Sequence, residues 1–309
     1  MTARGTFDSA VLSNTVLCRE HFRLTLALDS FPNTSPGQFV QVLCVSDESP
    51  AFMLRRPFSL AGRRDVGGRV EIDLIARAVG LGTRYLQSLR AGDRVNVLGP
   101  LGNAFALPAA GGIALLVGGG VGIPPMLYLA EALAKARTQA GDGASLTGVA
   151  FCGAMSRDLL PLSITNDALP PTRESVDPLY NIAEFADHGI PAVISTDDGG
   201  YGFKGFVTDT LRQYLDAWIT DNADRMRTVI YACGPEGMLK AVADVARRRD
   251  IACQVCVERA MACGLGTCQS CVIKQKKPDP AVPPLAGSEW CYRLACTDGP
   301  VFEAETLLW

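Results

Sequence analysis

The sequence predicts a multi-domain chain of three domains, in which an all-β part precedes an α/β part. Three observations support this fold class. The first hundred residues read as short alternating strands between turns, and from Gly111 the pattern changes to buried strands followed by helices. Closely spaced cysteines then follow Asp250. We therefore expect an antiparallel β-barrel in residues 1–108, a Rossmann-like domain with a parallel sheet in 109–250, and a small cysteine-rich domain in 251–309.

Length, charge and cysteine content narrow the class of protein. The 309 residues include 29 basic and 32 acidic side chains, and the net charge of −3 gives no electrostatic reason to expect nucleic acid or an anionic membrane as a partner. Residues 1–14 lack the apolar core of a secretory signal, and no run of about 18 apolar residues occurs. Eleven cysteines without such a signal favour a reducing compartment. We therefore expect a soluble, cytoplasmic protein.

The barrel prediction depends on the alternation of apolar and polar residues. Four runs alternate in this way and are bounded by Pro, Gly, Asn or Asp, namely residues 22–28, 37–43, 69–76 and 93–98. One helix is expected to interrupt them, from Leu81 or Gly82 to Leu89, because Ala91-Gly92 follows as a stop signal.

Two motifs in the predicted barrel have the chemistry of a nucleotide site. Arg56-Pro57-Phe58-Ser59 places a cation, an aromatic ring and a hydroxyl along one strand, which suits the pyrophosphate and the ring of a flavin. Gly80-Leu81-Gly82-Thr83 opens the helix, where free N–H groups favour a phosphate. Each motif alone is more often a surface strand or a capped turn than a nucleotide site, so the interpretation depends on their occurring together.

The second predicted domain contains two strand-to-helix turns. The apolar run 113–118 is typical of a strand buried in a parallel sheet, and residues 118–122, rich in glycine, link it to a helix predicted over 125–137. A second buried strand, 229–233, ends in Cys233-Gly234-Pro235 and enters another helix. Because ligands bind at the carboxyl ends of parallel strands, we expect the two turns to face one crevice. The first turn departs from a strict Gly-x-Gly-x-x-Gly, so a connection without a ligand remains the alternative.

Three segments of this domain carry weaker signals. Residues 162–187 are polar and Pro-rich, and we interpret most of them as a surface insertion. Asp197 and Asp198 are compatible with a metal or acid–base pair, although a solvated turn is the commoner role for such residues. Ser156 and Arg157 follow the predicted strand 146–152 and are candidates to reach a ribose 2′-phosphate, so NADH and NADPH both remain open.

The most specific motif is Cys-x4-Cys-x2-Cys, formed by Cys263, Cys268 and Cys271 and followed by a more distant cysteine. This spacing is the plant-type arrangement that holds a [2Fe–2S] cluster with four thiolates. Gly264 and Gly266 give the loop the freedom to turn tightly around the iron. We therefore predict an iron–sulfur cluster in this segment.

Two other interpretations of the cysteines are a structural zinc site and buried free thiols. A structural zinc site normally has two Cys-x2-Cys pairs and only one is present, while buried free thiols are the second alternative. Histidine ligation is not expected, because His21 and His188 lie far away in the sequence. Both Cys291 and Cys296 are candidates for the fourth ligand on spacing alone.

Taken together, the barrel motifs and the strand-to-helix turns resemble the ferredoxin–NADP reductase superfamily. The resemblance implies FAD in the barrel, with Arg56 at its phosphates, and NAD(H) as substrate in the second domain. The FAD-binding residues that it implies are Arg56, Pro57, Phe58, Ser59, Leu74, Ile75, Ala76, Gly80, Gly82 and Thr83. The implied NAD(H)-binding residues are Gly119, Gly120, Gly122, Cys233, Gly234 and Pro235.

The full order of motifs resembles a narrower family, the electron-transfer subunit of NAD-dependent dihydroorotate dehydrogenase (PyrK type). The runs that carry this resemblance begin at Thr196, Gly202, Glu258 and Cys296, and they read TDDG, GFKG, ERAMACG and CTDGPVF. The resemblance covers nearly the whole chain. Its departures are the insertion before residue 190, a longer segment between Cys271 and Cys296, and the surplus Cys291. It implies the cluster ligands Cys263, Cys268, Cys271 and Cys296.

This resemblance implies an oxidoreductase of pyrimidine biosynthesis that passes electrons between NAD(H), FAD and a [2Fe–2S] cluster. The partner would be a separate FMN-containing catalytic subunit of the dihydroorotate dehydrogenase type, in a heterotetramer. No catalytic base is expected in this chain, because hydride transfer between stacked rings needs orientation more than proton transfer.

Three alternative functions remain open at this point. The nearest is the flavin and iron–sulfur subunit of an NADH-dependent ferredoxin:NADP oxidoreductase or of a sulfide dehydrogenase, which has the same layout. A self-contained oxygenase reductase normally carries a complete ferredoxin domain, longer than the segment after Asp250. A scaffold that has lost a cofactor would contain no flavin when purified.

Overall fold

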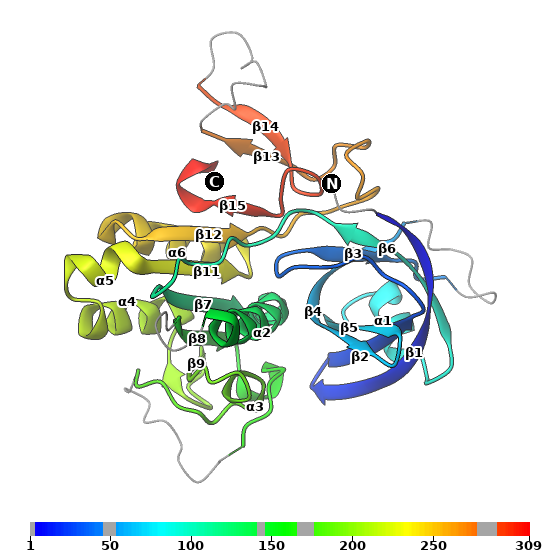
Figure 1. Cartoon of the computed structure of the whole chain (residues 1–309), viewed down its shortest axis with the longest axis horizontal. Helices are drawn as coiled ribbons and strands as arrows, with labels where there is room; N and C mark the ends of the chain where they lie inside the picture. The colour runs from blue at the N-terminus through cyan, green and yellow to red at the C-terminus, as the bar shows by residue number, and fades with distance from the viewer. Residues whose placement is uncertain (1–3, 46–53, 141–145, 166–175, 277–288) are drawn as a thin grey trace.

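The structure, a computed structural model, describes residues 4–45, 54–140, 146–165, 176–276 and 289–309. Figure 1 shows a β-barrel beside a layered α/β part, with a small sheet at the C-terminal end of the chain. These parts confirm the predicted fold class. The predicted domain boundaries at residues 108 and 250 stay predictions.

The barrel consists of six antiparallel strands that close in the order β1-β2-β5-β4-β3-β6. Alternation along each strand sends one set of side chains inward, where Val40, Leu60 and Ile72 are fully buried in a common core. Helix α1 packs against this core through Leu86. The bounds are β1 Gly5–Cys18, β2 His21–Leu28, β3 Phe39–Val42, β4 Arg56–Val66, β5 Arg69–Arg77, α1 Leu81–Ser88 and β6 Arg94–Leu101.

A seven-stranded sheet in the order β10-β9-β8-β7-β11-β12-β15 forms the centre of the second part. All neighbours are parallel except β12 and β15, which are antiparallel. The chain leaves β7 toward β8 on one side and later returns to β11 on the other, so the strand order reverses at β7, where ligands usually bind. The bounds are β7 Ile113–Gly119, β8 Thr147–Ala154, β9 Ala192–Thr196, β10 Phe203–Lys204, β11 Thr228–Cys233, β12 Ala252–Cys256 and β15 Val301–Glu303.

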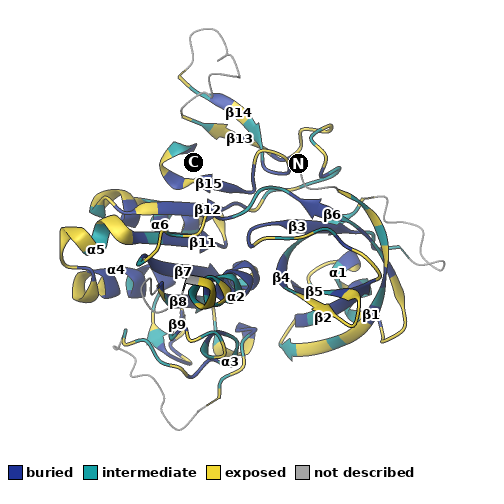
Figure 2. Ribbon diagram, in the orientation of Figure 1, coloured by how far each residue is buried: buried dark blue, intermediate teal, exposed yellow. Residues whose placement is uncertain are grey.

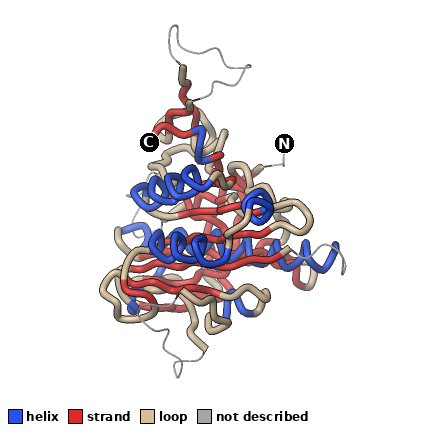
Figure 3. The backbone as a smooth tube through the Cα atoms, turned by 90° about the vertical axis from the view of Figure 1, so that its left-hand side faces the viewer, coloured by secondary structure: helices blue, strands red, loops and turns tan. Residues whose placement is uncertain are grey.

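Helices cover both faces of this sheet (Figure 3). Leu115 of β7 points into a core with α4 and α6, whereas the next residue, Leu116, points into a core with α2 and α3. Within the described part of the chain, no helix is both long and apolar enough to span a membrane. The helices are α2 Ile123–Ala140, α3 Ala183–Ala186, α4 Val207–Trp218, α5 Asn222–Arg227 and α6 Glu236–Arg249, and the 3₁₀ turns are η1 Gly120–Gly122, η2 Arg157–Leu159 and η3 Ala304–Thr306.

The C-terminal segment contributes to two sheets. It adds β12 and β15 to the large sheet, with Cys256 paired to Val301, and forms a small sheet in the order β14-β13-β16. The bounds of the small sheet are β13 Val272–Gln275, β14 Cys291–Leu294 and β16 Leu307–Leu308. The segment that contains the cysteine motif therefore starts and ends at the same edge of the large sheet.

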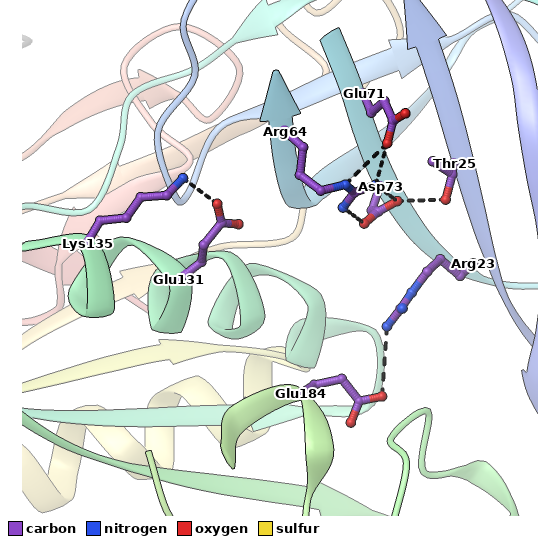
Figure 4. Close-up of polar contacts among 8 residues, drawn as sticks. All are labelled: Arg23, Thr25, Arg64, Glu71, Asp73, Glu131, Lys135 and Glu184. Atoms are coloured by element: carbon purple, nitrogen blue, oxygen red, sulfur yellow. Dashed lines mark hydrogen bonds and ion pairs between the residues drawn. The ribbon is translucent and has the colours of Figure 1, made fainter. Parts of the chain in front are cut away.

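Helix α2 packs directly against the barrel. The Tyr128 hydroxyl donates to the Thr34 carbonyl oxygen at 2.9 Å and lies 2.7 Å from the Thr34 hydroxyl, while its ring joins the barrel core. Figure 4 shows the polar contacts around this junction, where Arg23 of β2 lies 3.8 Å from Glu184 of α3. The barrel and the α/β part are thus joined by buried as well as charged contacts.

Burial corrects one expectation from the sequence. Part of the segment 162–187 lies outside the described residues, but Ile182 and Phe185 within it are fully buried in the core beneath α2. Figure 2 shows buried residues concentrated in the strands and on the inner faces of the helices. The described end of the predicted insertion is therefore part of the core.

Candidate functional site

The two barrel motifs meet at one end of the barrel. Arg56 begins β4, and Gly82 lies in the first turn of α1, where a Cβ atom would stand only 3.6 Å from the Arg56 Cγ atom. The Arg56 side chain is partly exposed and donates to the Leu54 carbonyl oxygen at 2.7 Å. A guanidinium beside free helical N–H groups is a suitable environment for a phosphate. The residues therefore fit the diphosphate part of FAD.

The strand that contains Arg56 presents its next residues to opposite sides. Phe58 is paired with Val40 and packs against the barrel core, whereas Ser59 is paired with Phe39, whose ring belongs to the core of the large sheet. Residues that are directly opposite in an antiparallel pair share a face, so Ser59 faces the α/β part. Pro57 lies on the same face as Ser59, opposite Gln41.

The remaining predicted FAD residues differ in how their side chains lie. Leu74 and Ala76 point into the barrel core, and only Ile75 joins the core beneath α2. The Thr83 hydroxyl caps α1, since it accepts from the N–H groups of Val79 and Gly80, both at 3.0 Å. Thr83 thus orders the Gly80 turn, and the contacts of these residues with a flavin stay predictions.

The glycine turn after β7 is packed too closely for a side chain at two of its positions. A Cβ atom on Gly119 would lie 2.5 Å from the Met238 Sδ atom, and one on Gly122 would lie 2.0 Å from the Cys233 carbonyl oxygen. Gly120 has a φ of +54°, and nothing lies within 4 Å of its Cβ position. The turn therefore exposes backbone at the carboxyl end of β7, which suits the close approach of a pyrophosphate.

The second turn, after β11, lies directly beside the first. Gly234 has a φ of +156°, Pro235 occupies the position just before α6, and Cys233 is paired with Cys256 at the end of the neighbouring strand β12. A hydrogen bond with Cys256, together with burial, raises the pKa of the Cys233 thiol well above its usual value. Cys233 is therefore a neutral packing group, and the two turns form one backbone-lined surface.

Four cysteines of the C-terminal segment lie as two pairs. Cys263 Sγ accepts from the backbone N–H of Cys268 at 3.4 Å, and the thiols of Cys271 and Cys296 are hydrogen-bonded. In the described part of the chain no three His, Cys, Asp or Glu side chains gather around a single metal position. Two pairs suit a two-iron cluster, because four thiolates are shared between its two irons.

The loop geometry supports this arrangement. Gly264 and Gly266 have φ values of +70° and +86°, so the chain turns back sharply between the first two cysteines. Cys263 and Cys268 are accessible, whereas Cys271 and Cys296 are each only 2% exposed. One pair therefore lies at the surface and the other lies inside.

One cysteine of each pair, Cys268 and Cys296, has a shifted pKa, and the two shifts are in opposite directions. Hydrogen bonds from Ser270 lower the pKa of Cys268 to about 6, which favours the thiolate that metals require. Burial and the Cys271 thiol raise the pKa of Cys296 to about 12. Metal binding at Cys296 must therefore displace a proton.

The choice between Cys291 and Cys296 has a geometric basis. Val272, next to Cys271, is paired with Leu294 near Cys296, whereas Cys291 is paired with Gln275 at the other end of the β13–β14 hairpin. Three residues of strand correspond to about 10 Å. Cys296 is thus the better placed of the two, and its role as ligand stays a prediction.

The weaker candidates in the α/β part have local roles. Asp198 accepts a hydrogen bond from the Gly200 N–H at 2.8 Å within an exposed turn. The pKa of Asp197 is raised, mainly by burial and in addition by the negative charge of Asp198. The Arg157 guanidinium lies 5.2 Å from the Tyr201 ring centroid, and Ser156 donates to Asp158. Ser156 and Asp198 therefore contact residues of their own turns, whereas Arg157 joins the turn after β8 to the loop after β9.

Sequence analysis missed two residues that the fold brings to these sites. Cys256 lies beside Cys233 at the end of β12, and Gln41 of β3 lies against Gly264 of the cysteine loop. In the sequence Gln41 is simply a polar residue of an alternating strand, at a position where the side chain is expected to point away from the barrel core. Its contact with Gly264 depends on the tertiary fold.

The chain is similar to known proteins in sequence and in structure. Residues 258–308 match a family model described as the iron–sulfur cluster binding domain of dihydroorotate dehydrogenase B. The electron transfer subunit of dihydroorotate dehydrogenase B (NAD(+)) from Geobacillus sp. (strain WCH70) is 38% identical, over 87% of this chain and 85% of that protein. The corresponding subunit of Geobacillus thermodenitrificans (strain NG80-2) is 37% identical over 95% of each.

A solved structure extends the similarity to the whole fold. The structure of an NADH-dependent reduced ferredoxin–NADP oxidoreductase, studied for flavin-based electron bifurcation, matches with a TM-score of 0.72 at 26% sequence identity. The match covers 97% of this chain and 90% of that chain. The likeness therefore includes the barrel, the large sheet and the cysteine segment.

Proposed function

The chain belongs to the family of electron transfer subunits of dihydroorotate dehydrogenase B (NAD(+)), and from this premise we propose that it is an NAD-dependent flavin and iron–sulfur oxidoreductase. It passes electrons between NAD(H), FAD and a [2Fe–2S] cluster. The proposal rests mainly on the position of β12. The last residue of this strand lies beside Cys233 of the dinucleotide turn, and the chain then continues directly into the cysteine loop.

The order of these sites explains why three carriers are needed. A bound flavin supplies the exchange between a hydride carrier, which moves two electrons, and an iron–sulfur cluster, which moves one. Arg56 and the start of α1 hold the flavin phosphates, and the backbone of Gly122 and Cys233 admits the dinucleotide. The four cysteines Cys263, Cys268, Cys271 and Cys296 hold the cluster. The residues orient the carriers, and we assign no residue as an acid or a base.

The partner is an FMN-containing catalytic subunit that oxidises dihydroorotate, assembled with this chain as a heterotetramer. The accessible cysteine pair supports a surface exit for electrons, because Cys268 is exposed and the neighbouring Leu265 is 40% exposed. An apolar side chain beside the proposed cluster is suited to a protein contact. Oxidation of dihydroorotate in the partner then ends in reduction of NAD on this chain.

We also propose a cytoplasmic location. All eleven cysteines are free, and most of them are buried in the folded chain. Free thiols in this number persist in a reducing compartment.

The test is reconstitution of the purified chain with a dihydroorotate dehydrogenase catalytic subunit. We expect about one FAD and one [2Fe–2S] cluster per chain, from extracted-flavin chromatography, iron analysis and absorbance, and dihydroorotate-dependent reduction of NAD only when both subunits are present. FMN or zinc in place of these cofactors would contradict the cofactor assignment. Full cofactor loading without complex formation, but with NADH-dependent reduction of ferredoxin, would instead place the chain with the ferredoxin-linked enzymes.

A further inference from the structure

The Gln41 side chain is a buried amide without a hydrogen-bond partner. Gln41 is 0% exposed, and neither its Nε2 nor its Oε1 atom has a partner among the described residues. Leaving such a group unpaired in the interior costs on the order of 1–3 kcal/mol. Most buried polar groups are paired, so this amide requires an explanation.

The fold directs this amide toward the cysteine loop. On β3, Val40 and Val42 point into the barrel core, so Phe39 and Gln41 point to the other side of the strand. There the Gln41 Nε2 atom would lie 2.7 Å from a Cβ atom on Gly264, and its Cδ atom would lie 2.9 Å from the same position. Gly264 follows Cys263 immediately. The amide is therefore held between the barrel and the first cysteine of the motif.

The neighbours of Gln41 include one cation and several apolar side chains, and the cation, Arg55, donates to the Gln41 carbonyl oxygen at 3.4 Å and offers no acceptor. Leu98 of β6 and Pro57 of β4 are the strand neighbours of Gln41, and the Leu101 Cδ1 atom lies 3.1 Å from the same Gly264 Cβ position. None of these side chains offers an acceptor to an N–H group. An iron–sulfur cluster does, because its thiolates and sulfides are negatively charged sulfur atoms, and hydrogen bonds to them tune its potential.

We propose that Gln41 is a positioning and tuning residue whose Nε2–H group donates a hydrogen bond to a sulfur atom of the cluster on the Cys263 side. The proposal rests on the proposed function, since it requires the cluster to be held by the four cysteines. A donor at this place stabilises the more negative, reduced state of the cluster. Gln41 therefore raises the reduction potential of the cluster and favours electron transfer onto it from the flavin.

The test compares Gln41→Leu with the matched control Gln38→Leu in the purified holoprotein. Gln38 is also a buried amide near the start of β3, but it is paired within the barrel region, since it donates to Gly102 O at 3.1 Å and accepts from Ser35 N at 2.9 Å. Electron paramagnetic resonance during a redox titration gives the cluster potential. We expect Gln41→Leu to lower the equilibrium constant for cluster reduction about tenfold, which corresponds to about 59 mV for one electron. Gln38→Leu should leave the cluster potential unchanged.

A second measurement observes the hydrogen bond itself. In protein labelled with ¹⁵N in the glutamine side chains, pulsed electron paramagnetic resonance detects a nitrogen coupled to the reduced cluster. Gln269, between Cys268 and Cys271, carries the same label, so any coupling from it is common to all variants. We expect the additional coupling from Gln41 to be lost in Gln41→Leu and kept in Gln38→Leu. If leucine disturbs the packing, Gln41→Met provides an unbranched apolar side chain of similar length for the same two measurements.

The outcomes separate this inference from the proposed function. An unchanged cluster potential in Gln41→Leu, or a shift confined to the flavin potential, overturns the role of Gln41 while the cluster assignment stands. A wild-type protein that holds iron but shows no [2Fe–2S] signal overturns the proposed function instead.

Discussion

Gly122 lies directly against Cys233, so that a Cβ atom at position 122 would stand 2.0 Å from the Cys233 carbonyl oxygen. Gly122 belongs to the turn after β7, and Cys233 is the last residue of β11, the strand paired with β7 in the centre of the sheet. The contact makes one continuous backbone surface at the point where the strand order reverses. Only glycine permits this approach.

We predict that Gly122→Ala disrupts the dinucleotide site. The added methyl group meets backbone atoms rather than a flexible side chain, so we expect a loss of about 1–3 kcal/mol in the free energy of unfolding. NADH should bind at least about tenfold more weakly, equivalent to about 1.4 kcal/mol, because the two turns must separate. Stopped-flow reduction of the flavin by NADH measures this effect.

Gly237→Ala is the control for this substitution. Nothing lies within 4 Å of its Cβ position, and the residue belongs to α6, where alanine is favoured over glycine. Its NADH affinity should equal that of the wild type. Equal effects of the two substitutions would refute the steric argument.

Arg56→Ala should weaken FAD retention without loss of iron. A charge-assisted hydrogen bond contributes about 1.5–3 kcal/mol, so we expect FAD to bind about ten- to a hundredfold more weakly. Flavin and iron contents measured on the same preparation give the result. Arg69→Ala, which removes an exposed arginine of β5, is the control. Loss of both cofactors from the Arg56 variant would indicate a folding defect.

The ligand assignment predicts unequal effects of two serine substitutions. Cys296→Ser should abolish or strongly alter the electron paramagnetic resonance signal of the cluster, because Cys296 is hydrogen-bonded to Cys271. Cys291→Ser should leave the signal nearly unchanged, since Cys291 lies at the far end of the hairpin. The reverse result would move the fourth ligand to Cys291.

His21 should make stability depend on pH. It is 2% exposed, its Nδ1 atom lies 3.0 Å from the Arg19 carbonyl oxygen, and burial lowers its pKa below the usual value. In the unfolded chain the His21 imidazole takes up a proton near pH 6.5, whereas in the folded protein it stays neutral to a lower pH. The contribution of His21 to the free energy of unfolding is therefore fully present above pH 6.5 and is lost as the pH falls through this value.

Chemical denaturation at about pH 7.5 and 5.5 tests this dependence across the ordinary histidine pKa. His21→Gln should reduce the difference in unfolding free energy between the two conditions. Burial also lowers the pKa of His188, so the substitution of both histidines should reduce the difference further. Identical pH dependence in the wild type and His21→Gln would exclude the proposed contribution.

Local patterns predicted much of the fold. Strands β2, β5 and β6 alternate clearly, and β7 and β11 are continuous apolar runs, so each was predicted close to its observed bounds. Strand β1 was missed because much of it is exposed, so its side chains do not give a clear apolar–polar alternation, and one of its two partners, β6, is distant in the sequence. The joining of β12 and β15 was also not predicted, because strand pairing at this distance leaves no local pattern.

The candidate site also contains some residues that a local sequence pattern predicts and others that only the fold brings together. The spacing of Cys263, Cys268 and Cys271 is a local property, since the three ligands must converge within one loop. The contact of Gln41 with Gly264 joins the barrel to the C-terminal segment and is a property of the packed molecule. Phe185 was assigned to a surface insertion because its helix α3 is too short to give a helical period.

The return of the chain to the edge of the sheet has an entropic consequence for assembly of the cluster. Cys256 and Val301 are paired across β12 and β15, so both ends of the cysteine segment are held by a ladder of hydrogen bonds that contains no iron. Closing a long flexible loop costs conformational entropy, which a free cysteine-rich peptide must offset with the binding energy of the metal. Here the sheet offsets that cost. Iron therefore enters a partly ordered frame, and its binding energy is available for holding the cluster rather than for folding the chain.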